Sequence, residues 1–260
     1  MLLFYILAFS LLIITSTFAL PHNLEERQQR AQVITRCTVP NTEALTFDDG
    51  PCKYIYDVIK ALKDSNATGT FFFNGNNWGC IYGQEDAKRV KYAYEQKQQI
   101  ASHTWAHKNL TTLSADQNVL EAFERITGAV PAFMRPPYGN YNTRVLDVAG
   151  IRKQTVVTWD FDSGDSTGAS VTKQKSLYDA VVKKHPSTIL SLAHEVHGKK
   201  FRMIVSYEVL PYAIKKLRGA GYKLVSVSEY LGKPAHQRVG KPSTRTMSSC
   251  FCNAMSIFVD

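Results

Sequence analysis

Hydrophobic and polar positions form two alternating patterns along the chain. Short apolar runs rich in β-branched and aromatic side chains predict buried strands at residues 44–47, 69–74, 99–102, 132–134, 155–158, 188–193 and 223–227. Between them, apolar residues recur every three or four positions, which predicts helices at residues 54–65, 84–98, 114–127, 143–150, 172–185 and 208–220. Ser114 fits the N-cap of one helix, and Gly150 fits the end of another.

The alternation of strands and helices predicts parallel strands joined by right-handed crossovers. Polar residues suited to chemistry follow separate strands: Asp48 and Asp49, His103, Arg135, Asp160 and Asp162, and His194. The carboxyl ends of many strands converge only at the top of a barrel. We therefore predict an α/β fold, a single distorted (β/α) barrel of about seven parallel strands, in preference to an open doubly wound sheet.

The two ends of the chain differ in composition from its middle. Residues 1–19 are apolar and uncharged and end in the small residue Ala19, which predicts a secretory signal peptide, with a membrane anchor as the alternative. We expect a polar N-terminal lead-in at residues 20–42, the folded domain at residues 43–232 and a basic, mostly irregular tail at residues 233–260. The leader predicts a secreted protein, extracellular or in the cell wall.

The chain carries a formal net charge of +9, from 31 Lys and Arg against 22 Asp and Glu. The basic residues are scattered, apart from a loose cluster in the tail, so most of them fit solvated surfaces. We expect a monomer with no nucleic-acid partner and no membrane partner.

Five cysteines become candidates for disulfides once secretion is expected. A bridge from Cys37 to Cys250 or Cys252 would tie the two ends of the chain together, and Cys52 and Cys80 each follow a predicted strand and could pair. One cysteine would then remain unpaired. Asn66 and Asn109 begin glycosylation sequons, which are meaningful in a secreted protein.

Two adjacent carboxylates, Asp48 and Asp49, end the first predicted strand, just before Gly50 and Pro51. In a regular strand they would point to opposite faces, but at a sharp bend both can face one pocket. Two carboxylates in one pocket repel each other unless a cation neutralises them. The alternative is an ordinary Asp-Asp-Gly turn.

His103 and His107 supply candidate ligands for such a cation. On one helical turn, side chains four residues apart face the same way and can bind one metal. Two neutral histidines and one carboxylate are a common ligand set for catalytic zinc. A pair of ordinary surface or core histidines is the alternative.

Five short motifs follow one another along the chain: TFDDGP at residues 46–51, HTWAH at 103–107, RPPYG at 135–139, WDFDSGD at 159–165 and LAH at 192–194. In this order they resemble the motifs of polysaccharide deacetylases, the NodB-homology enzymes of carbohydrate esterase family 4. The resemblance covers about residues 43–232, and residues 71–83 and 99–113 are most similar to fungal chitin deacetylases.

The resemblance implies a metal site and a general base. Asp49, His103 and His107 would bind a divalent metal, usually zinc, with cobalt as another possibility. Asp48 would accept a proton from the attacking water, and Arg135 would hold Asp48 in place.

The resemblance also implies an acid and an oxyanion donor. His194 would protonate the leaving amine, and the backbone N–H of Tyr138 would help to hold the oxyanion. An Asp of the fourth motif would steady Arg135 or its neighbourhood, and Asp165 is our choice. His197 is a rival for the role of His194.

The fourth motif departs from the family pattern, because Ser166 follows Asp165 where the family often has Trp. Asp160 and Asp162 are therefore alternatives to Asp165, and either could be a simple turn residue. Trp159 or Phe161 could supply the aromatic wall that the missing Trp would form.

Aromatic residues could stack on sugar rings, and the candidates are Trp78, Trp105 and Tyr141, although aromatic residues more often belong to a core. The resemblance as a whole implies a secreted, metal-dependent chitin deacetylase. Such a hydrolase cleaves the amide bond of N-acetylglucosamine units and yields chitosan and acetate. The alternatives are a deacetylase of peptidoglycan or acetylxylan, and an inactive carbohydrate-binding relative.

Overall fold

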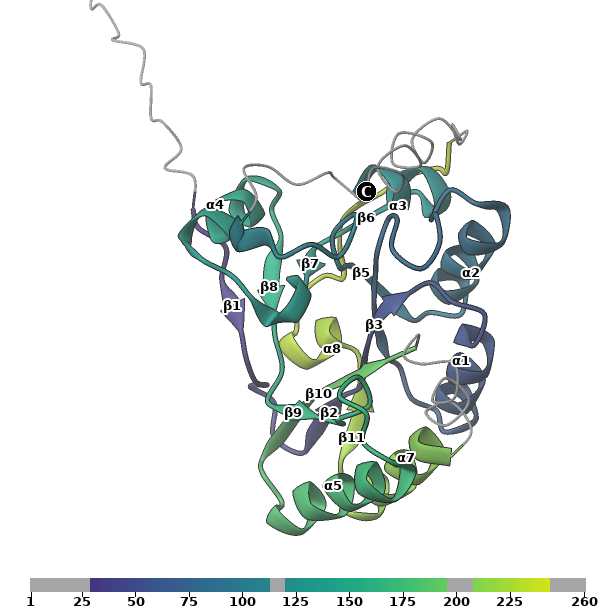
Figure 1. Ribbon diagram of the computed structural model, residues 1–260, viewed down its shortest axis with the longest axis vertical. Helices are drawn as coiled ribbons and strands as arrows, with labels where there is room; N and C mark the ends of the chain where they lie inside the picture. Colours follow the sequence, from purple (N-terminus) through teal and green to yellow (C-terminus); the bar gives the residue numbers. More distant parts are fainter. Residues whose placement is uncertain (1–28, 113–119, 196–207, 244–260) are drawn as a thin grey trace, which may run out of the picture.

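The computed structural model describes residues 29–112, 120–195 and 208–243, and ten of its strands form one large sheet (Figure 1). Across the sheet, the order is β1 (Val33–Ile34), β8 (Thr155–Val157), β7 (Phe133–Met134), β5 (Gln99–Ser102), β4 (Thr70–Phe73), β3 (Thr46–Gly50), β10 (Thr188–His194), β2 (Thr42–Ala44) and β11 (Lys223–Val225), with β9 (Phe161–Asp162) beside β10. All these pairings are parallel. The predicted α/β class is confirmed.

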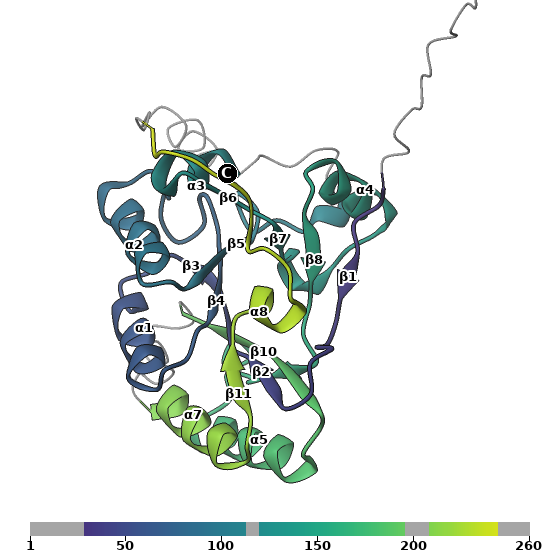
Figure 2. The same ribbon diagram turned by 180° about the vertical axis from the view of Figure 1, so that it is seen from behind.

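The sheet curves around an inner hydrophobic cluster, which includes Ala44, Phe72 and Val157. Most helices pack on the outer face of the sheet (Figures 1 and 2). The helices are α1 (Ile55–Asp64), α2 (Gln84–Glu95), α3 (Leu120–Thr127), α4 (Thr143–Ile151), α5 (Val171–Lys184), α7 (Leu210–Gly219) and α8 (Val227–Leu231), with 3-10 turns at Leu110–Thr112 and Pro137–Gly139. In the described residues, the order of hydrogen-bonded strands begins at β1 and ends at β11. No helix in the described ranges has the length and apolar character needed to cross a membrane.

Strand β4 shows why this sequence makes a buried parallel sheet. Its four residues, Thr70 to Phe73, are all buried. Phe71 and Phe73 face the helices, whereas Phe72 belongs to the inner cluster with small and branched residues of the other strands. A strand covered on both faces needs a continuous apolar run instead of an alternating one. Val227 and Tyr230 of α8 complete the inner cluster.

The folded part extends beyond the predicted domain at both ends. Strand β1 lies within the predicted lead-in, and β12 (His236–Val239) lies within the predicted tail, where it pairs antiparallel with β6 (Ala129–Pro131). The predicted strand at residues 44–47 is two strands, β2 and β3, separated at Leu45. Strands of two to five residues have too few positions to reveal a period, so the sequence pattern missed them. The predicted leader and Ser114 lie outside the described residues.

The predicted disulfide pairs are wrong. Cys37 is a buried free thiol, whose Sγ lies 3.0 Å from the Thr42 hydroxyl and donates to the Tyr230 carbonyl oxygen at 3.4 Å. The Cys52 thiol donates to the carbonyl oxygen of Glu195 at 2.9 Å and is not bridged to Cys80. Cys80 is disulfide-bonded. Cys250 and Cys252 lie outside the described residues.

Candidate active site

A bulge at the end of β3 turns both Asp48 and Asp49 into one pocket. Asp48 pairs with Phe72, but Gly50 pairs with Phe73, so Asp49 is an extra residue in the register. Asp49 has a left-handed backbone, with φ of 71°, which turns its carboxylate toward the side that Asp48 faces. Both side chains are buried. The prediction that two adjacent carboxylates share a pocket therefore holds, and the bulge is the physical reason.

Gly50 is required where the bulge ends. A Cβ at this position would lie 1.8 Å from Oε1 of Glu195. Any other side chain would displace the Glu195 carboxyl group or the strand end that carries Asp49.

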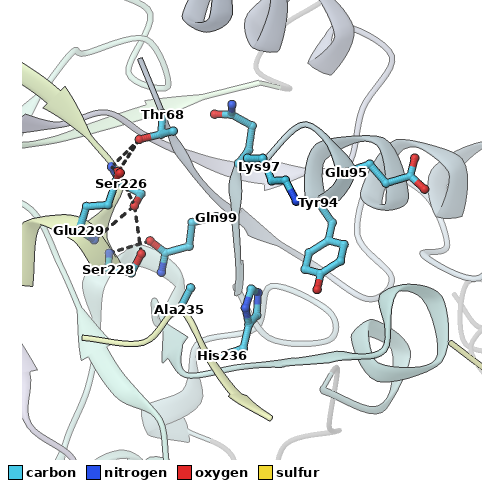
Figure 3. A pocket seen from close by; sticks show the side chains of 11 residues that line it. Thr68, Tyr94, Glu95, Lys97, Gln99, Ser226, Ser228, Glu229, Ala235 and His236 are labelled. Carbon is cyan, nitrogen blue, oxygen red and sulfur yellow. Dashed lines mark hydrogen bonds between the residues drawn. The ribbon is translucent and has the colours of Figure 1, made fainter. Parts of the chain in front are cut away.

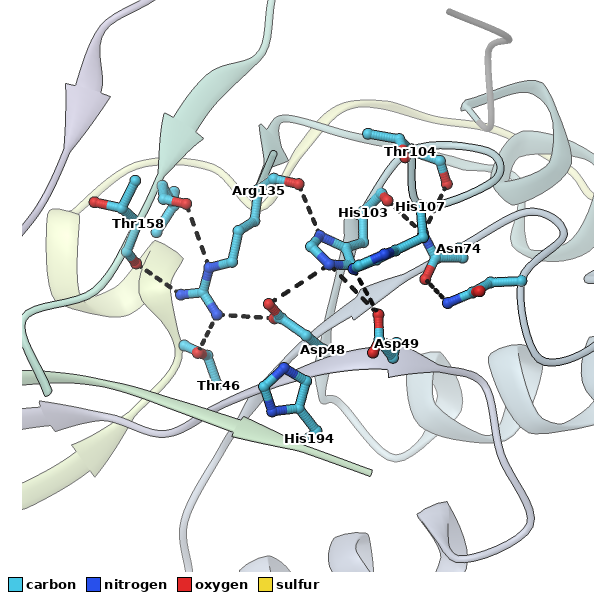
Figure 4. Close-up of polar contacts among 12 residues, drawn as sticks. Thr46, Asp48, Asp49, Asn74, His103, Thr104, His107, Arg135, Thr158 and His194 are labelled. Carbon is cyan, nitrogen blue, oxygen red and sulfur yellow. Dashed lines mark hydrogen bonds and ion pairs between the residues drawn. The ribbon is translucent and has the colours of Figure 1, made fainter. Parts of the chain in front are cut away.

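His103 and His107 converge on Asp49 (Figure 4). The distance from Asp49 Oδ1 to Nε2 is 3.5 Å for His103 and 3.2 Å for His107. One ligand atom from each of the three residues lies within 4.8 Å of the others. The predicted helical turn is wrong, because β5 ends at Ser102 and left-handed backbone at Thr104 and His107 makes a loop instead.

The chemistry of this donor set fits a divalent cation. His103 Nδ1 lies 2.8 Å from the backbone oxygen of Arg135, so it carries the proton and donates it there. The lone pair on His103 Nε2 then faces Asp49, as metal-ligating histidines require. Burial is the main cause that lowers the pKa of His107, and a proton on His103 would lower it further, so the His107 ring is neutral near pH 7. Asp49, His103 and His107 could together hold one metal ion.

Arg135 is fully buried beneath Asp48 and orients it. Its Nη1 donates to Asp48 Oδ1 at 2.8 Å and to the Thr46 hydroxyl at 2.6 Å. Its Nη2 donates to the carbonyl oxygen of Thr158 at 2.8 Å. Burial lowers the pKa of Arg135, while the charge of Asp48 opposes that shift. The guanidinium therefore fixes one oxygen of Asp48, and the other oxygen stays on the metal-ligand side, 3.7 Å from His103 Nε2.

Asp165 holds His194 and not Arg135, which corrects the predicted role. Its Oδ1 lies 2.9 Å from His194 Nδ1, and its Oδ2 accepts the backbone N–H of His194 at 2.6 Å. Burial alone would lower the pKa of His194, but the hydrogen bond and charge of Asp165, together with the charges of Asp48 and Asp49, raise it to about 9. His194 is therefore a protonated acid near neutral pH, and its ring lies beside Asp48 (Figure 4).

The other two acids of the fourth motif are structural. Asp160 Oδ1 accepts the backbone N–H of Leu190 at 2.7 Å, and Asp162 Oδ1 accepts that of Gly164 at 2.8 Å. From the sequence alone, Asp160, Asp162 and Asp165 were all candidates for the same supporting role. Their partners are distinguished only by the pairing of β9 with β10.

The predicted aromatic residues occupy different environments. Tyr138 is 64% exposed, has a φ of 62°, and its ring lies 4.8 Å from that of His107. Trp78 is 54% exposed and Tyr141 is 39% exposed, whereas Trp105 is only 6% exposed and belongs to the core. A buried indole does not fit the predicted sugar-stacking role, because Trp105 packs over Gly75 and against Tyr82. Trp159 lies 5.6 Å from the Arg135 guanidinium, while Phe161 packs on Tyr178.

Three residues around the site were missed by the sequence analysis. Asn74 Nδ2 donates to the backbone oxygens of His103 and Thr104, and so holds the metal-ligand loop. The Thr46 hydroxyl links Arg135 to the backbone oxygen of Ser191. Burial raises the pKa of Glu195 well above its ordinary value, which favours the neutral acid. The only signal was that Asn74 and Glu195 directly follow strands and that Thr46 is the first residue of the TFDDGP motif. The predicted rival His197 lies outside the described residues.

Comparisons with known proteins agree with this arrangement. Residues 35–157 match the family model of polysaccharide deacetylases. The chain is 36% identical over 225 residues to a chitin deacetylase of a Pestalotiopsis species, covering 80% of this chain and 71% of that protein. It is 30% identical over 210 residues to the chitin deacetylase of Colletotrichum lindemuthianum, covering 76% and 83%. The structure of the chitin deacetylase from that fungus aligns with a TM-score of 0.73 at 25% identity, covering 84% of this chain and 99% of that one.

The fold, the Asp-His-His site and these similarities place the chain among the polysaccharide deacetylases, and it belongs to that family. It is a hydrolase that acts on carbon–nitrogen amide bonds. The resemblance stated from the five motifs is confirmed.

Proposed function

We propose that this protein is a secreted, metal-dependent chitin deacetylase, which hydrolyses the N-acetyl groups of N-acetylglucosamine units to give chitosan and acetate. The observation that carries the proposal is the pocket that holds Asp48 with Arg135 on one side and the Asp49, His103 and His107 cluster on the other. The fungal relatives named chitin deacetylases support the choice of chitin.

The three ligands Asp49, His103 and His107 would hold zinc, or cobalt in its place. When bound, such an ion acts as a Lewis acid that polarises the acetyl carbonyl and makes water more acidic. The remaining steps belong to side chains of the chain itself.

Asp48 is placed to act as the base. Arg135 fixes one carboxylate oxygen, so the other can accept a proton from the water that attacks the acetyl carbon. Water adds to the carbonyl carbon, the carbonyl oxygen becomes an oxyanion, and the proton passes to Asp48. The Tyr138 backbone, in the turn beside His107, would donate to that oxyanion.

His194 is placed to act as the acid. Asp165 holds its Nδ1, so Nε2 on the far side of the ring delivers the proton to the amide nitrogen. The carbon–nitrogen bond then breaks, with acetate and a free amine as products. An amide nitrogen leaves poorly unless it is protonated, so the reaction needs an acid separate from the base.

Secretion, glycosylation at Asn66 and Asn109, and a monomeric state belong to the same proposal. The apolar leader at residues 1–19 supports secretion. Asn66 is exposed, and the Asn109 side chain accepts hydrogen bonds from Thr111 of its own sequon.

The test of the proposal is acetate release by the zinc-loaded protein from chitin oligomers, peptidoglycan and acetylxylan, measured side by side. We expect the highest kcat/KM on chitin oligomers. A clear preference for either of the other polymers would overturn the choice of substrate, and binding without any acetate release would overturn the assignment as an enzyme.

A further inference from the structure

Trp159 contacts the guanidinium group that orients the proposed base. Its ring centre lies 5.6 Å from Cζ of Arg135, within the distance at which an aromatic face attracts a cation. The same guanidinium donates from Nη2 to the carbonyl oxygen of Thr158, the residue before Trp159, at 2.8 Å (Figure 4). Arg135 also donates to Asp48 Oδ1 at 2.8 Å. The indole is therefore part of the packing that fixes the direction of Asp48.

The same indole packs against the turn that carries Tyr138. A Cβ on Gly139, the last residue of this turn, would lie 2.8 Å from Cη2 of Trp159, so the glycine backbone faces the six-membered ring directly. The backbone is left-handed at Tyr138, with φ of 62°, and at Gly139, with φ of 69°. Left-handed backbone at a residue other than glycine persists only where the surrounding structure holds it. Trp159 supplies this support at Gly139, and the His107 ring, 4.8 Å from that of Tyr138, supplies it one residue earlier.

The position of Trp159 is itself fixed through its two neighbours in the chain. The N–H of Thr158 donates to the carbonyl oxygen of Ile34 in β1 at 2.8 Å. The N–H of Asp160 donates to the carbonyl oxygen of Leu190 in β10 at 3.0 Å, and Asp160 Oδ1 accepts the Leu190 N–H at 2.7 Å. Because the backbone is anchored on both sides, the indole can hold the groups that it touches.

We propose that Trp159 is a positioning residue for the deacetylation, which sets the distance between the base and the oxyanion donor. Through Arg135 it holds Asp48, which takes the proton from the attacking water. Through Gly139 it holds the turn whose Tyr138 N–H donates to the oxyanion. Both groups act in one step, the addition of water to the acetyl carbon, and a misplacement of about 1 Å costs roughly 10²-fold in rate. This role rests on the proposed function.

A wall for stacking on sugar is the rival role for Trp159. Trp159 is partly buried by Arg135 and Gly139, whereas Trp78 is 54% exposed. A wall acts on substrate binding, so its loss raises KM. A residue that positions groups for the transition state lowers kcat and kcat/KM equally when it is removed, with KM unchanged. Kinetics therefore distinguish the two roles.

The test is the steady-state rate of acetate release from chitin tetramer by the full-length, zinc-loaded variants Trp159→Leu and Trp159→Phe. In Trp159→Leu, we expect kcat to fall by about 10²-fold, with KM and zinc content unchanged. Trp159→Phe keeps an aromatic ring beside Arg135, so it should recover part of that loss. A raised KM with unchanged kcat in Trp159→Leu would overturn the inference in favour of the sugar wall.

Tyr222→Leu controls for the loss of a buried ring as such. Tyr222 is 3% exposed, and its ring packs 5.2 Å from that of His185. It directly precedes β11, at the amino ends of the parallel strands and away from the active site. We expect its unfolding temperature to fall without a change in kcat. If kcat fell equally in Tyr222→Leu and Trp159→Leu, the effect would be one of general stability, and the inference would be overturned.

A double-mutant cycle with Gly139→Ala tests the contact between the turn and the indole. In the wild-type background, the added methyl group pushes the turn away from Trp159, so kcat should fall. In the Trp159→Leu background, the smaller side chain leaves room, so the same substitution should cost at least about tenfold less in kcat. Gly232→Ala is the matched control, because Gly232 is also left-handed, with φ of 61°, but nothing lies within 4 Å of the added Cβ. Losses that simply multiply in the double variant would contradict the inference.

The outcomes separate this inference from the proposed function. A wild-type protein that releases no acetate overturns the proposed function, and the role of Trp159 fails with it. An active wild-type protein whose kcat is unaffected by Trp159→Leu overturns the role of Trp159 alone.

Discussion

Strand β5 joins two polar regions with opposite chemistry. At its carboxyl end, His103 meets Asp49 and His107 in a cluster of charged and ligating atoms that lies on looped, left-handed backbone. At its amino end, Gln99 lies in regular strand, and its side-chain oxygen accepts the Thr70 hydroxyl and the Ser228 N–H. Left-handed backbone at residues other than glycine costs about 1–3 kcal/mol, and such strain is concentrated at functional sites. The carboxyl end thus has the donor atoms to hold a cation, whereas the polar side chain at the amino end is fixed by neutral hydrogen bonds within the fold.

The strongest way to break this contrast is to remove a metal ligand at the carboxyl end. In His103→Ala, we expect bound zinc to fall well below one equivalent and acetate release to fall to background, because the ion supplies several kcal/mol of transition-state stabilisation. Elemental analysis and an acetate assay measure the two effects. His185→Ala is the control, since His185 is exposed and its ring contacts the Ala220 backbone oxygen. Unchanged zinc content in His103→Ala would exclude His103 as a ligand.

Removing the base should separate chemistry from metal binding. In Asp48→Asn, we expect kcat to fall by roughly 10²–10⁴, the usual contribution of a general base, with zinc content retained. The control is Asp64→Asn, since Asp64 only pairs with Lys60 on the surface of α1. Retained turnover in Asp48→Asn would remove Asp48 from the role of base.

The Asp165–His194 pair should set the alkaline limit of activity. The acid is protonated below its pKa of about 9, so the wild-type rate should fall as the pH rises through that value. In Asp165→Asn, the carboxylate charge is lost while burial remains, so the alkaline fall in rate should occur at a lower pH. We also expect kcat at pH values below that fall to decrease by about 10–100-fold, as for lost supporting partners in metal sites.

A pH profile of kcat tests this prediction. Asp162→Asn is the matched control, because Asp162 comes from the same motif but accepts only the Gly164 N–H. An alkaline limb at the same pH in Asp165→Asn and the wild type would contradict the role of Asp165.

The smallest expected effect lies at the amino end. Glu229 closes the capping box of α8 with Ser226, and its pKa is lowered by hydrogen bonds from Thr68 and Ser226 that outweigh burial. A carboxyl group with a lowered pKa stabilises the fold above its unfolded pKa and loses that effect as the pH falls. Glu229→Gln should therefore cost about 0.5–2 kcal/mol of unfolding free energy at pH 7, and less in acid.

Thermal unfolding at pH 7 and at acid pH measures the effect of Glu229→Gln. Lys60→Gln is a suitable comparison, because Lys60 forms only an exposed ion pair with Asp64. An equal loss of stability at both pH values would show that the carboxylate charge of Glu229 is not involved.

The catalytic residues were more predictable than their connections. Asp48, Asp49, His103, Arg135 and His194 all lie at the carboxyl ends of strands or directly after them, and the structure brings them together. The partner of Asp165 was mispredicted, because three acids within six residues offer no local signal to choose between them. Trp105 was misplaced for a related reason, since a tryptophan in a loop motif can face either the core or solvent.

What the sequence determined by itself was the order of most strands and helices and the residues at the strand ends. Apolar runs and helical spacing are local properties of the chain, so they need no knowledge of distant contacts. Tertiary structure alone decided which way those side chains turn. The bulge at Asp49 exists because β3 pairs with β4, and the contact between Asp165 and His194 exists because β9 lies beside β10. A cavity beside Gln99 depends on α8 and β12, which approach β5 only in the folded chain (Figure 3).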